Sequence, residues 1–103
     1  MELIETPIFT KQVRAALPDE DYRALHLYLI ARPEAGPVIP GSGGLRKLRW
    51  GLPGRGKRGG ARLIYYLKSA AGQIFLLFLF PKSLRSNLTP AELRILRQLV
   101  DDD

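Results

Sequence analysis

With 103 residues, 46% of them hydrophobic and 25% charged, the chain has the length and composition of one folded domain over residues 1–103 and is unlike a disordered segment. It contains no cysteine, which excludes disulfides, thiolate nucleophiles and zinc sites built on sulfur. No apolar run approaches the ~20 residues that cross a bilayer, and the N-terminus lacks a signal-peptide pattern, so we expect a cytoplasmic protein without a membrane partner.

Positive charge is concentrated in the middle of the chain. The net charge is +6, yet no Asp or Glu lies between Glu34 and Glu92. Since that interval holds ten basic residues, the two ends together carry a net charge of −4. A surface of one sign favours a polyanionic partner, nucleic acid before an anionic membrane, although a basic face that only aids solubility has the same composition. The ten residues are Arg46, Lys47, Arg49, Arg55, Lys57, Arg58, Arg62, Lys68, Lys82 and Arg85.

The first third of the chain predicts a short edge strand and two helices. The strand covers residues 3–4. Thr6-Pro7 offers an N-cap followed by proline at the first helical position, which predicts a helix through residues 8–17. Pro18-Asp19 ends that helix and caps a second one, whose apolar residues repeat at helical spacing up to Arg32-Pro33. The pair predicts a helical hairpin.

The middle of the chain predicts a sheet. A loop rich in proline and glycine over residues 36–44 precedes a strand over residues 45–50. Residues 51–60 hold five glycines and a proline, so we expect a mobile basic connection there rather than a regular element. Further strands are expected over residues 61–68 and 74–80, and the second is apolar on both faces, as in a central strand.

The last element is the most clearly marked helix. Thr89-Pro90-Ala91-Glu92 has the pattern of a capping box, which predicts a helix over residues 90–100. We therefore predict an α+β domain in which an N-terminal helical hairpin and a C-terminal helix pack on a largely antiparallel, twisted sheet of about four strands, with the helices segregated from the open face of the sheet. The apolar stripe of the last helix, which packs on the sheet or is contested by a partner, is Leu93, Leu96 and Leu99/Val100.

Three segments carry a resemblance to a known family. They are GGLRKLRW (residues 43–50), GKRGGARLIYY (residues 56–66) and the run ending in Phe80-Pro81-Lys82. The similarity continues through residues 86–89 into the last helix. The sequence resembles the RelE/HigB toxins of bacterial type II toxin–antitoxin pairs. That resemblance implies an endoribonuclease, or mRNA interferase, which cuts messenger RNA in the ribosomal A site beside 16S rRNA, and which a helix-turn-helix antitoxin neutralises.

Cleavage of RNA through its 2′-hydroxyl requires a base for that proton, cations for the charge that builds on the phosphate, and an acid for the departing 5′-oxygen. The acid-free middle supplies no carboxylates for a metal cage. The only histidine, His26, lies in a predicted helix, where we expect a structural role. We therefore predict neither a metal nor a cofactor, and catalysis by lysine and arginine as in the family that the chain resembles.

Lys47 and Arg49 stand two residues apart on a predicted strand, so both project from one face and can reach the same phosphate. By similarity they match the paired basic residues of the family's first central strand. Lysine can lose its proton among cationic neighbours, whereas arginine stays charged. We predict that Lys47 accepts the proton and Arg49 stabilises the transition state; the alternative is a solvated strand face.

Arg62 directly follows Gly59-Gly60 and matches the family's phosphate-binding arginine. Its planar guanidinium can hold two phosphate oxygens, which a lysine would not reproduce; the alternative is an ordinary arginine at a strand end. The adjoining glycine-rich segment holds side chains too loosely for chemistry, so its cations are expected to bind RNA. The predicted residues for binding RNA or the ribosome are Arg46, Arg55, Lys57, Arg58 and Lys68.

Lys82 and Arg85 match the basic segment that completes the site in the resembled family, with Lys82 as the acid for the leaving oxygen. Well-known members have a further arginine near Ser83 and a tyrosine near Leu88-Thr89, and this chain lacks both. Either Lys82 and Arg85 take over these roles, or another residue stacks on the nucleobase. The aromatic alternatives, for both of which core packing is favoured, are Tyr66 and Phe80.

Two other functions fit the same sequence. A non-catalytic module that binds RNA or the ribosome has the same charge pattern and needs no replacement for the tyrosine. An interaction protein uses the leucines of the last helix to dock a partner. Mutants separate the three, because a nuclease depends on Lys47 and Arg62, a binding module on Lys57 and Arg58, and an interaction protein on the last helix.

Overall fold

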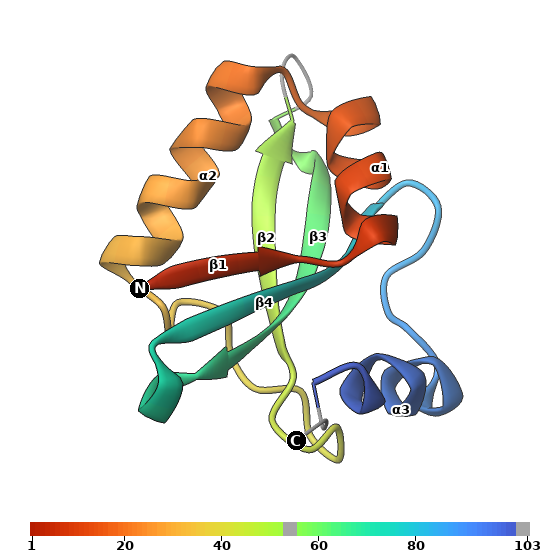
Figure 1. Ribbon diagram of the computed structural model, residues 1–103. Helices are drawn as coiled ribbons and strands as arrows, with labels where there is room; N and C mark the ends of the chain where they lie inside the picture. Colours follow the sequence, from red (N-terminus) through yellow and green to blue (C-terminus); the bar gives the residue numbers. More distant parts are fainter. Residues whose placement is uncertain (53–55, 101–103) are drawn as a thin grey trace.

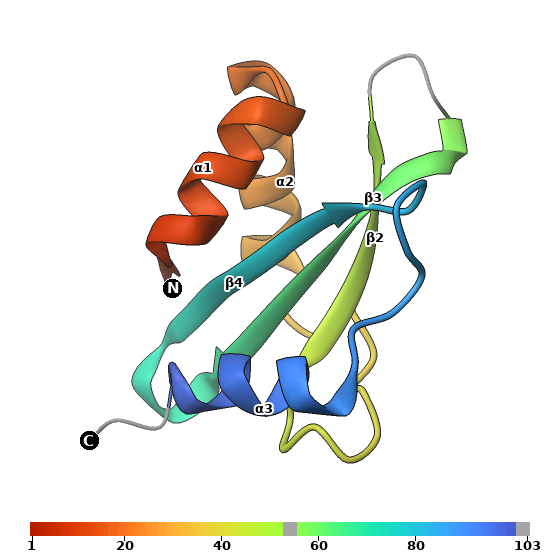
Figure 2. The same cartoon turned by 90° about the vertical axis from the view of Figure 1, so that its right-hand side faces the viewer.

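The computed structural model of the chain describes residues 1–52 and 56–100, and for residues 52 and 56–59 it describes the backbone alone. These residues form a four-stranded sheet with two helices on one face and one on the other (Figures 1 and 2). In chain order the elements are β1 (Glu2–Glu5), α1 (Pro7–Ala16), α2 (Asp19–Ala31), β2 (Arg46–Leu52), β3 (Gly56–Lys68), the 3₁₀ turn η1 (Ser69–Ala71), β4 (Gln73–Pro81) and α3 (Pro90–Gln98).

The sheet has the strand order β1-β4-β3-β2. β1 runs parallel to β4, whereas β4 with β3 and β3 with β2 are antiparallel. β4 therefore has a strand on either side, which agrees with its apolar sequence on both faces. The predicted α+β domain with a largely antiparallel sheet is confirmed.

The helical hairpin begins at a side-chain cap. The hydroxyl of Thr6 accepts a hydrogen bond from Phe9 N at 3.1 Å and donates one to the carbonyl of Leu77 at 3.0 Å, so the cap also attaches α1 to β4. α2 begins at Pro18-Asp19 as predicted, with Pro18 as its N-cap, but no side chain makes a capping hydrogen bond there. Three acidic residues in the first turn of α2 instead complement the positive end of the helix dipole.

The larger core lies between the helical hairpin and the sheet. Period-2 alternation turns Leu48 of β2 and Leu63 and Tyr65 of β3 toward α1 and α2. Burial of these apolar side chains is the main favourable term in the folding of this face. The buried residues of this core are Phe9, Val13, Leu17, Leu25, Leu29, Leu48, Ala61, Leu63, Tyr65, Ile74, Leu76 and Leu79.

Tyr65 connects this core to the loop before β2. Its buried hydroxyl accepts a hydrogen bond from Gly36 N at 2.9 Å and donates one to the carbonyl of Pro33 at 2.8 Å. We expect Tyr65→Phe to lower the free energy of unfolding by about 1–3 kcal/mol, because both partners lose a bond inside the fold. Urea unfolding measures the loss. Tyr28→Phe is the matched control, since that hydroxyl has no hydrogen bond among the described residues; equal effects of the two changes would contradict the assignment.

The opposite face is covered in part by α3 (Figure 2). Leu96 of α3 and Val100 pack on Leu45 and Ile64 in a second core that also contains Leu77 and Phe80. The predicted segregation of all helices from one open face is therefore wrong, because the apolar stripe of α3 needs its own sheet surface. The helix ends at Gln98 rather than at residue 100, and the next two residues make 3₁₀-type hydrogen bonds.

The predicted glycine-rich connection is much shorter than expected. β3 already begins at Gly56, so the backbone of residues 56–60 belongs to a strand, and the prediction of an irregular segment over all of residues 51–60 is wrong. Leu52 is paired with Gly56, after a register shift that follows Trp50. Inter-strand pairing here overrides the low strand preference of glycine. Residues 53–55 lie outside the described part of the chain.

A polar cluster joins β1 to both helices of the hairpin. The Glu5 carboxylate accepts hydrogen bonds from the hydroxyls of Thr10 and Tyr22. Burial alone would raise the pKa of Glu5, but these bonds, together with the charges of His26 and Arg14, hold it below its ordinary value. The carboxylate therefore stabilises the fold above the ordinary pKa of glutamate, and this contribution is lost as pH falls through the lower folded-state value.

We therefore expect Glu5→Gln to be less stable than the wild type at about pH 7, with a gap that narrows toward about pH 3 as the wild-type carboxylate is protonated. Urea unfolding at several pH values measures that gap. A constant gap across this range would show that the charge of Glu5 does not contribute.

Among the described residues, no helix is both long enough and apolar enough to cross a membrane.

Candidate functional site

Two basic residues of β2, Lys47 and Arg49, lie on the face that α3 leaves partly open. Leu48 packs in the core below α1 and α2, so its neighbours Lys47 and Arg49 project from the other face. Lys47 is partly exposed and Arg49 is exposed. The prediction that these two side chains share a face is confirmed.

Arg62 lies on the same face of the neighbouring strand. In the pairing of β2 with β3, Arg49 stands directly opposite Arg62. Side chains of directly opposed residues in an antiparallel pair have Cβ atoms about 5 Å apart, so two guanidinium groups begin side by side. Sequence reasoning singled out both residues but did not establish that they are cross-strand partners.

The environment of Arg62 is unusual for a charged side chain. It is only 4% exposed, and the hydrogen bond described for its guanidinium is a long one, 3.4 Å, to the carbonyl of Ala61. None of the described residues forms an ion pair with it, and residues 35–91 contain no carboxylate at all. Burial, and then the charge of Arg49, lower the pKa of Arg62. A buried cation beside a second cation is costly unless an anion binds. This pair therefore favours a bound phosphate.

A loop after β4 brings further polar groups to this face. The ammonium of Lys47 donates a hydrogen bond of 2.6 Å to Oδ1 of Asn87, which lies just before α3. Lys82 extends the β3–β4 ladder by one step, since its backbone N–H donates to the carbonyl of Gly60 at 2.9 Å. Gly60 is two residues from Arg62, so Lys82 lies near the end of the same surface. Sequence reasoning missed Asn87, because no local pattern predicts a contact between residues 40 positions apart.

Arg85 has a different environment from the other predicted catalytic residues. Its guanidinium forms an ion pair with Glu92 of α3, and its Nε donates to the backbone carbonyl of Asn87 at 3.2 Å. It also lies 6.0 Å from the centre of the Phe80 ring. Glu92 is at the same time the capping-box residue of α3, as predicted, and accepts from Thr89 N at 2.8 Å. The charge of Arg85 is thus already matched within the fold.

Two residues predicted to bind RNA lie away from this surface. Arg46 is on the other face of β2, where its guanidinium donates to the carbonyls of Glu34 and Gly36. Lys68 is at the far end of β3, six residues from Arg62, which is about 20 Å along a strand. The structure does not bring either of them to Lys47, Arg49 and Arg62.

Three other predicted binding residues fall where the structure describes little or nothing. Arg55 lies outside the described residues. Lys57 and Arg58 belong to β3 by their backbone, but their side chains are not described.

The two aromatic residues considered for base stacking are occupied by contacts inside the protein. Phe80 is 4% exposed and is the β4 partner of Arg62. Tyr66 carries the guanidinium of Arg97 over its ring, 4.6 Å from the centroid, and Arg97 also donates to the carbonyl of Gly43 at 2.8 Å. Packing, the favoured alternative for both rings, agrees with these contacts.

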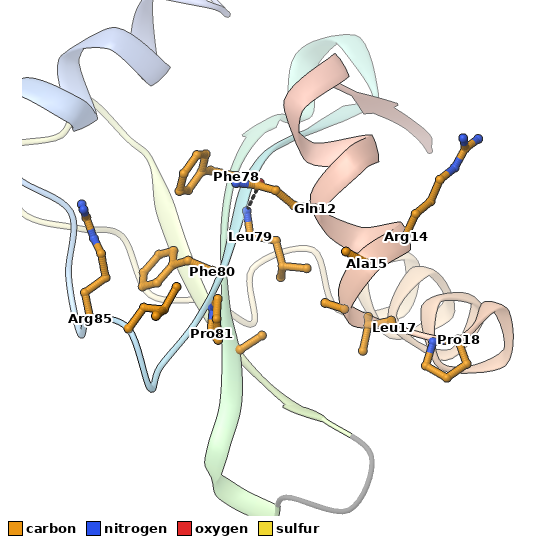
Figure 3. A pocket seen from close by; sticks show the side chains of 13 residues that line it. Gln12, Arg14, Ala15, Leu17, Pro18, Phe78, Leu79, Phe80, Pro81 and Arg85 are labelled. Carbon is orange, nitrogen blue, oxygen red and sulfur yellow. Dashed lines mark hydrogen bonds between the residues drawn. The ribbon is translucent and has the colours of Figure 1, made fainter.

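A groove of about 920 Å³ runs along the edge of β4 beyond the part that β1 pairs, between α1 and the segment after β4 (Figure 3). Leu79 N on this edge donates to Oε1 of Gln12 at 2.7 Å, so α1 satisfies part of the unpaired strand. Figure 3 shows that Arg14 points away from Phe78 and Phe80. The groove is lined mainly by apolar side chains, and Lys47, Arg49 and Arg62 are not among the residues that line it.

His26 lies apart from the basic surface. Its ring packs edge-on against Tyr22 with centroids 4.1 Å apart, and burial lowers its pKa although the charge of Glu5 opposes this. These contacts agree with the structural role expected for it. Within the described residues, no three His, Asp or Glu side chains come together in a group that could hold a metal ion.

A comparison with known protein families matches the part of the chain that contains the basic sheet surface. A family model described as the RelE toxin of the RelE/RelB toxin–antitoxin system matches residues 39–102, which is more than half of the chain. The chain belongs to the RelE family of toxins. The matched segment begins before β2 and includes Lys47, Arg49, Arg62, Lys82 and Asn87.

Membership of this RelE family makes the protein a toxin of a toxin–antitoxin system, with an antitoxin as its partner. Toxins of the family are generally endoribonucleases that cut messenger RNA. The α1–α2 hairpin lies outside the match and provides the core on which the matched sheet packs.

Proposed function

We propose that this RelE-family toxin is a metal-independent, ribosome-dependent endoribonuclease that cleaves messenger RNA in the ribosomal A site and so inhibits translation. The observation that carries the proposal is the Arg49–Arg62 cross-strand pair, in which a nearly buried guanidinium has no carboxylate partner among the described residues. A phosphate is the group that such a pair favours, because a guanidinium can hold two of its oxygens.

In the proposed reaction, Lys47 accepts the proton of the 2′-hydroxyl, and the 2′-oxygen attacks the adjacent phosphorus. Arg49 and Arg62 stabilise the negative charge that builds on the phosphate oxygens. The bond from phosphorus to the 5′-oxygen breaks, and Lys82 gives that oxygen a proton. The products are a 2′,3′-cyclic phosphate and a 5′-hydroxyl. Arg85, already paired with Glu92, holds the loop that carries Asn87.

The ribosome positions the messenger, which so small a protein cannot do by itself. A bound messenger in the A site is already positioned, which lowers the entropic cost of aligning the 2′-oxygen with the phosphate. We propose that Arg55, Lys57, Arg58 and Lys68 contact the backbone of the messenger or 16S rRNA. We propose that the toxin acts in the cytoplasm. We also propose that its antitoxin is a helix-turn-helix protein.

Inducible expression followed by mapping of messenger 5′ ends tests the proposal. We expect growth arrest together with new 5′ ends at a fixed position within translated codons, and neither in an Arg62→Ala strain. Growth arrest without new ends would favour a non-catalytic module that binds RNA or the ribosome. New ends outside translated regions would contradict the dependence on the ribosome.

A further inference from the structure

Lys47 makes a hydrogen bond to Asn87, a residue without a chemical role in the proposed reaction. Its Nζ donates to Oδ1 of Asn87 at 2.6 Å, a short, charge-assisted hydrogen bond. Lysine has a flexible four-carbon stem and, on a partly exposed strand face, samples several rotamers. One acceptor at a fixed place removes much of that freedom.

Asn87 is itself held in place. Its backbone carbonyl accepts from Arg85 Nε at 3.2 Å, and Arg85 is paired with Glu92. Glu92 also closes the capping box with Thr89, two residues after Asn87. These contacts hold the backbone of the segment between β4 and α3 at Asn87, and the exposed side chain of Asn87 reaches Lys47 from there.

We propose that Asn87 is a positioning residue for Lys47, an inference that rests on the proposed nuclease function. A general base must lie within hydrogen-bond reach of the proton that it takes. An amide oxygen suits this role because it is neutral. The lysine amine that forms when the proton leaves still has two N–H groups, so it continues to donate to Oδ1 while its lone pair faces the 2′-hydroxyl. A carboxylate at this place would instead favour the ammonium form.

The test compares cleavage by the full-length protein on programmed ribosomes with that of its variants. We expect Asn87→Ala to lower kcat by about 10-fold to 10²-fold with KM unchanged, the effect of a misplaced base. In a Lys47→Met background the same change costs nothing further, because Asn87 acts through Lys47. Ser86→Ala, the exposed neighbour, is the matched control and cleaves at the wild-type rate.

Asn87→Asp provides a readout that a merely structural role would not move. The aspartate keeps an acceptor oxygen but adds a negative charge beside the lysine. We expect it to move the pH profile of cleavage to higher pH, so that it restores most of the rate that alanine loses only at the upper end of that profile, where the lysine amine forms despite the added charge. If Asn87→Ala disturbs the loop, the pH profile of Asn87→Asp still tests the positioning role.

The outcomes separate this inference from the function on which it rests. Wild-type cleavage by Asn87→Ala, in a protein that Lys47→Met inactivates, would overturn the positioning role and leave the nuclease proposal intact. Equal losses from Asn87→Ala with and without Lys47 would also overturn it. Wild-type cleavage by Lys47→Met would instead overturn the assignment of the base, and the role of Asn87 would fall with it.

Discussion

Arg62→Met is expected to lower RNA cleavage by about 10²–10³-fold, the usual cost of losing one preorganised group that stabilises charge in the transition state. Arg62→Lys is also expected to cleave poorly, because an ammonium does not reproduce the two parallel hydrogen bonds of a guanidinium. Single-turnover cleavage of messenger on programmed ribosomes measures both. Arg23→Met removes one positive charge from an exposed position on α2 and is the matched control.

Arg62→Met is also expected to unfold at a higher urea concentration than the wild type. Arg62 is 4% exposed, lies opposite Arg49 and has no ion pair among the described residues. Replacing it with an apolar side chain of similar length removes the cost of burying that charge, a gain of about 1–3 kcal/mol in the free energy of unfolding. Loss of activity with gain of stability is the pattern of a binding residue held in an unfavourable environment. A destabilised Arg62→Met would show instead that the arginine supports the fold.

Lys47→Met is expected to lower the cleavage rate by about 10²–10⁴-fold, the range for loss of a positioned general base. Lys47→Arg distinguishes a base from a simple cation. Arginine keeps the positive charge but does not give up its proton, so it binds the messenger and does not restore cleavage. Lys11→Met, on an exposed position of α1, is the control for the loss of one charge. If Lys47→Arg cleaves at close to the wild-type rate, Lys47 acts only through its positive charge and is not the general base.

Local signals in the sequence predicted the elements that depend on local contacts. The capping box of Thr89 and Glu92 and the Thr6 cap before Pro7 both form as expected, because their partners lie within one helical turn. The strand at Gly56–Gly60 was missed for the converse reason. Glycine has little strand preference of its own, and only the neighbouring strand keeps this backbone extended.

The same distinction applies to the site. The spacing of Lys47 and Arg49 was enough to place them on one face, since side chains alternate along a strand. It was not enough to predict that Arg49 faces Arg62, because that depends on the register between two strands and on the shift after Trp50. The contacts of Arg46 and Arg85 could not be predicted from the sequence either. Arg46 donates to backbone carbonyls of the loop before β2, and Arg85 pairs with a carboxylate of α3.

The chemistry of the RNA ends is the most direct test of a site built from lysine and arginine. The purified protein is added to ribosomes that carry a defined messenger with a vacant A site, and the ends of the fragments are identified by mass spectrometry. Attack by the 2′-hydroxyl predicts a 2′,3′-cyclic phosphate on the upstream fragment and a 5′-hydroxyl on the downstream one, and Arg62→Met is expected to form both about 10²–10³-fold more slowly. A 3′-hydroxyl with a 5′-phosphate, or an uncut messenger, would contradict the account.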